Sequence, residues 1–287
     1  MDKIPKFIAE ISSNHHQDLA RCLEFIDTAA RIGCDAVKFQ LFKVDQLFAP
    51  EILAKSKDHQ NRKAWELPLE FVPELAQRSR DRGIEFSCTP FYLEAVDELE
   101  PYVDFYKIAS YELLWDDLIR SCATTLKPLI LSTGMATLEE VIHAVSVARD
   151  SGCEDLTLLH CVSAYPTPAR ECNLAAIENL RMNCNCDVGW SDHTVDPAVL
   201  FRAIHRWRAT DIEFHLDLDG EGEEFGPGHC WLPDQIERVI KDISIGIGSD
   251  GSGEKNPSHS ELPDRDWRAD RADGLRPLKK IRERFPS

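Results

Sequence analysis

Short runs of β-branched and aromatic residues alternate with longer amphipathic segments eight times along the first 243 residues of the chain. The runs that we predict as strands span residues 6–12, 35–42, 84–89, 104–110, 128–133, 156–163, 187–194 and 211–219. Eight strand–helix units in about 240 residues fit the size of a (β/α)8 TIM barrel, an α/β fold. A doubly wound open sheet is the main alternative, and it is disfavoured because no Gly-rich phosphate loop follows an early strand.

The segments between these runs carry apolar residues at three- and four-residue spacing, which is typical of helices packed on a sheet. We predict helices over residues 19–32, 69–82 and 138–151. Asp18 and Thr137 precede two of these segments and are suitable N-caps. Gly33, Gly83 and Gly152 follow the three segments, where glycine commonly ends a helix.

Several predicted strands alternate apolar with polar residues. In residues 35–42, Val37 and Phe39 alternate with Lys38 and Gln40, and the same alternation recurs in residues 6–12, 84–89 and 211–219. In a barrel with an outer ring of helices the apolar set faces the helices, so the polar set points inward. Buried charges are costly unless they are paired, hydrated or bound to a ligand, so we expect them to gather at the mouth formed by the carboxyl ends of the strands. An antiparallel sheet with one solvated face is the alternative, and the intervening helices argue against it.

Composition narrows the class of partner. The 287 residues include 50 acidic and 33 basic side chains, which give a net charge of −17. A strongly acidic surface argues against nucleic acid and anionic membranes as partners, but it leaves a small anionic substrate open. No apolar run approaches the roughly 18 residues that span a bilayer, and the N-terminus lacks the apolar core of a signal peptide. The ten cysteines are scattered, so we predict a cytoplasmic protein with reduced thiols.

Two histidines lie near the carboxyl ends of consecutive predicted strands. His193 belongs to residues 187–194 and His215 to residues 211–219. Parallel strands joined by one helix bring both imidazoles to the same sheet edge, where they form half of a divalent metal site. Two imidazoles with oxygen ligands suit Mn, Fe, Co or Zn better than an ion held by oxygens alone. His160 ends another strand, and we treat it as a structural or supporting residue.

Lys38 and Lys107 lie inside otherwise apolar strands. Lysine is normally exposed, so two buried lysines predict a bound anion. Hydroxyl groups at nearby strand ends complete a candidate phosphate or carboxylate cradle: Thr89, Ser110, Ser132, Thr133, Ser163 and Ser191. Taken singly, each is more often a turn or cap residue. Glu10 is the most conspicuous carboxylate of the predicted barrel; its structural alternative is an ion pair with Lys38 or support of a histidine.

Two segments interrupt the barrel pattern. Residues 43–68 form a long charged insertion on the catalytic side of a barrel, where either a lid or a mobile solvated excursion would fit. Residues 244–287 are rich in Gly, Ser, Pro and charged residues. We therefore divide the chain into a catalytic barrel domain, residues 1–243, and an extended C-terminal arm, residues 244–287.

Eight motifs follow one another in order through the predicted barrel. They are FIAEISSNHHQDL (7–19), DAVKFQ (35–40), FSCTPF (86–91), FYKIAS (105–110), ILSTGM (130–135), LLHCVSAYPTP (158–168), GWSDHT (189–194) and IEFH (212–215). In their order and spacing the chain resembles the N-acetylneuraminate (sialic acid) synthase family. Members of that family are (β/α)8 barrel enzymes of carbohydrate and polysaccharide biosynthesis. The resemblance implies a transferase that condenses phosphoenolpyruvate with an N-acylated aldose to give a sialic-acid-type nonulosonate and phosphate.

The resemblance also implies a role for each matching residue. His193 and His215 would bind a divalent metal, most commonly Mn²⁺, with Mg²⁺, Co²⁺ or Zn²⁺ as alternatives. Glu10, Lys38 and Lys107 would act in catalysis, with Glu10 handling a water or a proton during phosphate departure. The residues implied to hold phosphoenolpyruvate are Lys38, Thr89, Lys107, Ser110, Ser132, Ser163 and Ser191. Tyr165 matches a residue on the sugar side of the family's site.

The chain departs from the family pattern in three places. Position 163 is Ser where many members have Asn. The family's GPD motif, whose aspartate contacts the sugar, corresponds here to GPG at residues 226–228, so no carboxylate stands at that position. Full-length members carry a C-terminal antifreeze-like domain that supplies an arginine to the partner subunit, and we expect this chain to lack it. Arg265, Arg268 and Arg271 of the arm are candidate substitutes.

Two alternative functions stay open on the sequence. The chain is either a phosphoenolpyruvate-dependent synthase with a different aldose acceptor, or a non-catalytic sugar-binding barrel in surface polysaccharide biosynthesis. Retention of Glu10, both lysines and both histidines favours an enzyme. Small-molecule substrates are the expected partners. A homodimer is also open, because family members are dimers.

Overall fold

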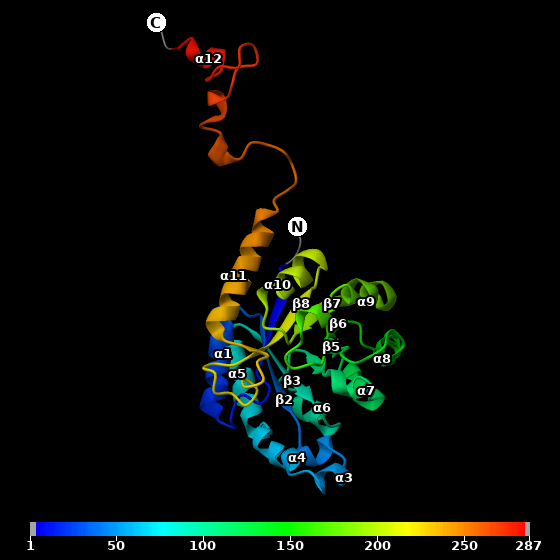
Figure 1. Cartoon of the computed structure of the whole chain (residues 1–287). Helices are drawn as coiled ribbons and strands as arrows, with labels where there is room; N and C mark the ends of the chain where they lie inside the picture. Colours follow the sequence, from blue (N-terminus) through cyan, green and yellow to red (C-terminus); the bar gives the residue numbers. More distant parts are fainter. Residues whose placement is uncertain (1–3, 285–287) are drawn as a thin grey trace. The chain divides into compact units, whose positions relative to one another are not determined.

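The computed structural model describes residues 4–284 of the chain. It divides into two compact units, one reaching Ile247 and one that begins at Gly248. The first unit is a set of parallel strands surrounded by helices (Figure 1). Within residues 4–284, no helix combines the length and the apolar character needed to cross a lipid bilayer.

Eight parallel strands form the wall of the first unit. They are β1 (Lys6–Glu10), β2 (Ala36–Leu41), β3 (Glu85–Pro90), β4 (Tyr106–Ile108), β5 (Leu129–Ser132), β6 (Leu156–Cys161), β7 (Asp187–Asp192) and β8 (Asp211–Leu216), and the short β9 (Cys230–Trp231) pairs with β8. Neighbours run in the order β3-β2-β1-β8-β7-β6-β5-β4, and a parallel bridge between Ser87 and Phe105 joins β3 to β4. The ring therefore closes, and the predicted (β/α)8 barrel is confirmed.

All eight predicted strands are present, but most were predicted too long at their carboxyl ends. The largest difference is at β8, which ends at Leu216 where we predicted residue 219. At β7, the strand ends at Asp192, so His193 lies just beyond the hydrogen-bonded ladder. The alternation of polar and apolar residues continues past the last ladder bond, which explains why the pattern overestimates the strand.

Helices cover the outside of the barrel. They are α1 (Leu19–Ile32), α5 (Val72–Arg82), α6 (Glu94–Leu99), α7 (Asp116–Thr124), α8 (Leu138–Asp150), α9 (Ala176–Cys184), α10 (Pro197–Phe201) and α11 (Pro233–Ser249). Asp18 accepts from the backbone of α1, Gly33 ends α1 in the left-handed region, and Thr137 forms a capping box at α8. The predicted helix over residues 69–82 is α-helical only from Val72. Pro73 cannot donate to a carbonyl four residues earlier, so the preceding turn is a 3-10 turn.

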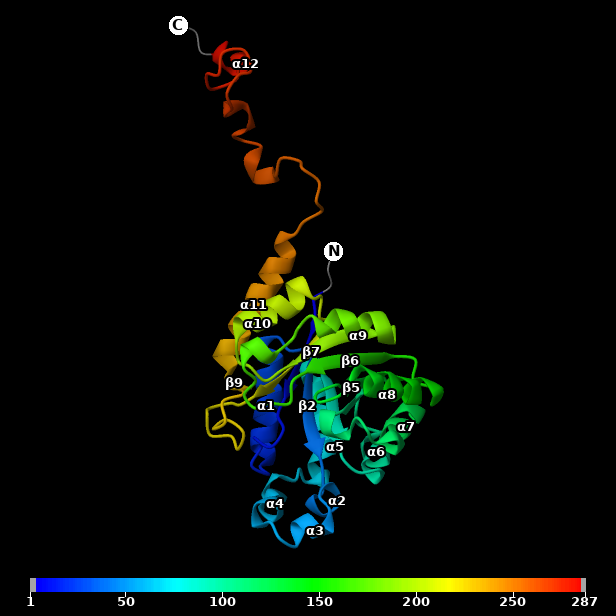
Figure 2. The same cartoon turned by 45° about the vertical axis from the view of Figure 1, so that its right-hand side comes forward.

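Shorter helical turns lie in the connections: η2 (Leu69–Phe71), η3 (Ser110–Glu112), η4 (Ala169–Glu171) and the π-helical turn η5 (Arg202–Arg206). The insertion after β2 folds into α2 (Val44–Leu47), α3 (Pro50–Leu53), α4 (Lys57–Asn61) and η1 (Arg62–Trp65). These turns pack on an apolar cluster built around Phe42, Val44 and Phe91. Figures 1 and 2 show α3 and α4 at the same end of the barrel as the long loop after β8. The insertion is therefore a folded flap at the mouth.

The barrel wall divides the apolar core into two parts. The larger part lies between strands and helices and includes Phe7, Phe39 and Phe214. The smaller part is an apolar plug inside the barrel, formed by Ile8, Ala36, Phe105, Ile130 and Leu159. Two residues further along four of these strands, the inward positions carry Glu10, Lys38, Lys107 and Ser132. Because side chains alternate along a strand, the polar residues form a layer directly next to the plug.

The predicted start of the arm at residue 244 lies inside α11 (Pro233–Ser249). Ile236, Val239, Ile240 and Ile243 are the buried residues of this helix, and it continues through the first Gly-containing residues of the predicted arm. The second unit contains η6 (His259–Glu261), η7 (Arg265–Trp267) and α12 (Lys279–Arg282). Arg265, Arg268 and Arg271 belong to this unit, and their substitute role stays a prediction.

Candidate active site

Four charged side chains lie inside the barrel next to the apolar plug. They are Glu10, Lys38, Lys107 and Glu213, each at most 4% exposed, and they come from β1, β2, β4 and β8. We call them the interior charge network. Two cations and two anions make the network formally neutral, and such pairing offsets part of the cost of burying each charge.

Glu10 and Lys38 form an ion pair across β1 and β2, whose register places them opposite one another. Lys38 Nζ also donates to Thr89 Oγ1 at 3.0 Å, and Gln40 Nε2 donates to Glu10 Oε1 at 2.9 Å. Burial disfavours the charged form of Lys38, but the charges of Glu10 and Glu213 outweigh it and raise the Lys38 pKa. The structural alternative for Glu10, an ion pair with Lys38, is therefore present.

Lys107 is paired less completely. Its Nζ lies 3.5 Å from Glu213 Oε1 and donates to the Ile108 carbonyl at 3.3 Å. Burial lowers the pKa of Lys107. Ser191 Oγ donates to Glu213 Oε1 at 3.3 Å, whereas Glu213 Oε2 has no hydrogen-bond partner within the described part of the chain. Lys107 and Glu213 thus keep hydrogen-bonding capacity that a ligand inside the barrel would use.

Five of the six predicted hydroxyl residues lie in two groups. Those buried inside the barrel are Thr89, Ser132 and Ser191. Ser110 and Ser163 converge on Gly134, whose N–H donates to Ser110 Oγ at 3.0 Å. A methyl group on Gly134 would lie 2.8 Å from Ser110 Oγ and would overlap Ser163 Oγ. Thr133 Oγ1 donates to the Leu159 carbonyl at 3.1 Å, so this hydroxyl is used within the sheet.

His193 and His215 come together, with ring centroids 5.3 Å apart. Nδ1 of His193 lies 2.8 Å from the Val162 carbonyl oxygen, and Nδ1 of His215 lies 2.8 Å from Glu224 Oε2. These oxygen acceptors favour the proton on Nδ1 and leave Nε2 of each ring as a lone-pair donor. Burial, with the neighbouring His215, lowers the pKa of His193 to about 3. His193 is therefore neutral at physiological pH, the form that binds metals.

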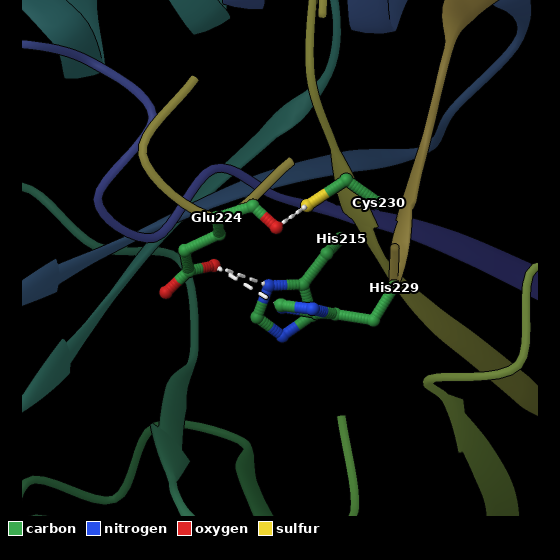
Figure 3. Close-up of side chains that lie close together, drawn as sticks. All are labelled: His215, Glu224, His229 and Cys230. Atoms are coloured by element: carbon green, nitrogen blue, oxygen red, sulfur yellow. Dashed lines mark hydrogen bonds and ion pairs between the residues drawn. The ribbon is translucent and has the colours of Figure 1, made fainter. Parts of the chain in front are cut away.

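The loop after β8 adds a third histidine and a carboxylate. Figure 3 shows Glu224 directed at the rings of His215 and His229, with Cys230 beside them. The ligand atoms of these four residues all lie within 4.8 Å of one another. The Tyr165 ring packs on the same cluster, with its centroid 4.3 Å from that of His193 and 5.0 Å from that of His229. The predicted histidine pair is therefore part of a larger group.

These donors fit a divalent metal ion. Neutral imidazole and carboxylate are ligands that first-row divalent ions share. Burial raises the pKa of Cys230 to about 12, and its Sγ donates to the Glu224 carbonyl at 3.3 Å, so it is a protonated thiol. A candidate metal-binding cluster of His215, Glu224, His229 and Cys230 thus lies at the carboxyl end of β8, and His193 packs beside it, so its role as a ligand stays a prediction.

His160 lies on the outer side of the barrel wall and outside this group. Its Nε2 contacts the Cys172 carbonyl at 2.9 Å, and its ring packs against Trp190 with centroids 5.3 Å apart. The structural interpretation of His160 therefore fits its position.

The sequence did not single out Gln40, Glu213, Glu224 or His229. Glu213 and Gln40 share the inward parity of His215 and Lys38, so the alternation along the strands already contained the signal that identifies them. Glu224 and His229 lie in a loop, whose path no periodic pattern reports. The GPG segment lacks the family's aspartate, but Glu224 brings a carboxylate into the site from four residues before Gly228.

Residues 25–255 match the model of the NeuB family. The uncharacterised protein MJ1065 of Methanocaldococcus jannaschii is 38% identical over 262 residues, which cover 90% of this chain and 75% of that protein. N,N'-diacetyllegionaminic acid synthase of Legionella pneumophila is 35% identical over 276 residues, covering 89% of this chain and 76% of that protein. The crystal structure of N-acetylneuraminic acid (sialic acid) synthetase from Leptospira borgpetersenii serovar Hardjo-bovis is similar with a TM-score of 0.80 at 28% identity, covering 92% of this chain and 90% of that one. The resemblance in the motifs is confirmed, and the chain belongs to the NeuB family.

Proposed function

We propose that this protein condenses phosphoenolpyruvate with an N-acylated aldose and releases a sialic-acid-type nonulosonate and phosphate. The observation that carries the proposal is the meeting of the interior charge network and the histidine cluster inside one barrel, where Glu10 is the register partner of His215. Relatives named as synthases of N,N'-diacetyllegionaminic acid and pseudaminic acid support it.

Phosphoenolpyruvate would bind next to the two buried lysines. Lys38 and Lys107 offset its negative charge in a site from which water is largely excluded. Because Glu10 and Glu213 already pair with these lysines, the anion competes for their N–H groups, and Lys107 is the more available at 3.5 Å from its partner. The hydroxyl groups that would complete the cradle are Thr89, Ser110, Ser132, Ser163 and Ser191.

The aldose would bind on the histidine side of the site. His193 and His215 would hold a divalent ion such as Mn²⁺, which would supply a Lewis acid for the aldehyde oxygen. Tyr165 packs on both rings and is 41% exposed, so it would contact the sugar at the entrance.

The reaction balances with one water molecule. C3 of phosphoenolpyruvate forms a bond to the aldehyde carbon, whose oxygen takes up a proton and becomes a hydroxyl. Water adds to the resulting cation at C2 and loses a proton, for which the buried Glu10 carboxylate is the proposed acceptor. The bond between C2 and the phosphate oxygen then breaks, phosphate takes up the proton of the C2 hydroxyl, and the 2-keto acid remains.

The acceptor is the least constrained part of the proposal. The name of the Legionella relative specifies a product with two N-acetyl groups. The loop after β8 departs from the family's GPD motif and presents Glu224 in place of an aspartate at position 228. We therefore include both mono- and diacetamido aldoses among the candidate acceptors.

Phosphate release tests the function directly. The purified chain is incubated with Mn²⁺, phosphoenolpyruvate and a panel of 2-acetamido, 2,4-diacetamido and unacylated aldoses, and we expect release with at least one of the N-acylated aldoses. Lys107→Met should abolish release, whereas Lys55→Met, at an exposed lysine, should not. Release only with aldoses that lack an N-acyl group would indicate a different synthase. Binding of phosphoenolpyruvate without release for any aldose would favour a non-catalytic barrel.

A further inference from the structure

One histidine of the metal-binding cluster has no part in the proposed function. His229 ends the loop after β8 and directly precedes β9, where Cys230 pairs with His215 in parallel register. This pairing holds His229 beside the strand end that carries His215, and its side chain is buried. The position of the His229 ring is therefore set by the sheet.

Each of the three imidazoles directs one nitrogen at an oxygen acceptor, and the other nitrogen has no hydrogen-bond partner within residues 4–284. His193 and His215 use Nδ1, which lies 2.8 Å from the Val162 carbonyl in one case and 2.8 Å from Glu224 in the other. His229 turns Nε2 toward the same Glu224 oxygen at 3.6 Å, and its Nδ1 has no hydrogen-bond partner among the residues that the structure describes. A neutral imidazole that carries its proton on one nitrogen is an acceptor at the other. Three nitrogen lone pairs therefore remain, on Nε2 of His193, on Nε2 of His215 and on Nδ1 of His229.

The spacing of the three rings is compatible with one ion. A metal–nitrogen bond of about 2.1 Å puts the ion about 3.2 Å from a ring centroid, so two rings that share it have centroids at most about 6.4 Å apart. The observed centroid separations are 5.3 Å for His193 and His215, 4.8 Å for His215 and His229, and 6.3 Å for His193 and His229. All three lie within the limit, and each pair meets edge-on rather than stacked.

Glu224 is held as a fixed acceptor for two of these rings. Ser12 Oγ donates to Glu224 Oε1 at 2.6 Å, and the backbone N–H of Glu224 donates to Asn14 Oδ1 at 2.8 Å. These contacts from the segment after β1 leave Oε2 directed at His215 and His229 (Figure 3). A carboxylate that accepts from the second nitrogen of a ligating imidazole fixes its tautomer and ring orientation.

We propose that His229 is a third metal ligand through Nδ1, alongside Nε2 of His193 and His215, and that Glu224 positions both His215 and His229. The proposal rests on the proposed function only in taking the cluster to bind a divalent ion. Three imidazole nitrogen donors can hold a first-row divalent ion such as Mn²⁺, Co²⁺ or Zn²⁺ and leave positions for oxygen ligands. Cys230, whose Sγ donates to the Glu224 carbonyl at 3.3 Å, stays outside the donor set.

Calorimetric titration of the metal-free full-length chain with Mn²⁺ and with Co²⁺ tests the ligand. We expect His229→Ala to raise the metal Kd at least about 100-fold and Glu224→Gln to raise it about 10- to 100-fold. His160→Ala is the matched control, since it removes a half-buried imidazole on the outside of the barrel wall, and its Kd should equal that of the wild type. A Kd for His229→Ala within about threefold of the wild type, with binding lost in His193→Ala, would overturn the proposal.

A second measurement needs no variant. Pulsed electron paramagnetic resonance of the Mn²⁺-loaded wild-type chain counts the imidazole nitrogens bound to the ion; three couplings are expected, and two would overturn the proposal. Circular dichroism of the metal-free variants checks that each is folded before its Kd is compared. The outcome is separable from the proposed function: an ion held by three histidines without phosphate release contradicts only the function, and phosphate release with two histidine couplings contradicts only this inference.

Discussion

Replacing Lys38 with methionine tests whether the charges inside the barrel stabilise each other. The Lys38 and Glu10 side chains are 3% and 1% exposed and form an ion pair. Methionine keeps most of the volume of lysine but removes the charge, so the Glu10 carboxylate is left buried with the Gln40 amide as its hydrogen-bond donor. Removal of one partner from a buried pair costs about 3–5 kcal/mol, because the other charge is left uncompensated.

We therefore expect Lys38→Met to lower the free energy of unfolding by about 3–5 kcal/mol, measured by urea denaturation at neutral pH. This is a large share of the roughly 5–15 kcal/mol that stabilises a typical domain. Adding Glu10→Gln removes the unpaired charge, so the double variant should regain much of the loss. Lys55→Met, at an exposed position, should change the free energy by no more than about 0.5 kcal/mol.

Two results would refute this reasoning. A loss below about 1 kcal/mol for Lys38→Met, the range of an exposed ion pair, would mean that water solvates Glu10 well enough to replace the lysine. A double variant whose loss equals the sum of the two single losses would mean that the two charges do not interact, since coupled residues deviate from additivity.

Three other changes probe separate parts of the barrel. Arg82 and Arg78 hold the pKa of Asp27 well below its usual range, so Asp27→Asn should cost about 1 kcal/mol at neutral pH. Denaturant titrations should show this difference beginning to shrink as the pH falls below about 4, the pKa of the unfolded chain, and vanishing only when Asp27 is protonated in the folded state as well. Burial raises the pKa of Glu112 to about 7, so between about pH 5 and pH 7 the folded state keeps a proton that the unfolded chain releases. The wild type should therefore lose stability as the pH rises from about 5 to about 8, and its melting temperature should fall relative to that of Glu112→Gln. Gly134→Ala places a methyl group against Ser110 and Ser163, and it should cost about 1–3 kcal/mol and weaken phosphoenolpyruvate binding in calorimetry.

Each of these changes has an opposing result. Asp27→Asn that loses the same free energy at every pH would show that its effect is steric. Parallel melting curves of the wild type and Glu112→Gln across the pH range would mean that Glu112 is ionised in the folded state. A Gly134→Ala variant with unchanged stability and affinity would show that the loop after β5 shifts without cost.

The local features of the fold were readable because they depend on neighbouring residues. Asp18, Gly33 and Thr137 mark helix ends through contacts within one turn, and all three predicted helix caps are present in the structure. The strand positions followed from the alternation of side chains, which also assigned Lys38 to the inside of the barrel. The strand ends were less accurate, since the last ladder bond depends on the neighbouring strand.

The site was readable in part for the same reason. The inward parity and the order of the strands indicated that Glu10, both lysines, His193 and His215 share one interior. The pairing of each lysine with a glutamate was not determined by one strand, because it depends on the register between strands. Glu10 had two structural alternatives, an ion pair with Lys38 or support of a histidine. The register between β1 and β2 places Glu10 opposite Lys38, and the ion pair forms.

The sequence by itself determined the barrel, the inward charges and two histidines at neighbouring strand ends, because the periods of strands and helices are local properties of the chain. Only the tertiary structure decided what surrounds those histidines. His229 reaches them because β9 pairs with β8, and Glu224 because Ser12 and Asn14, more than two hundred residues earlier, hold its loop. A loop carries no periodic pattern, so its position is fixed by contacts with distant segments and becomes visible only once the barrel has closed.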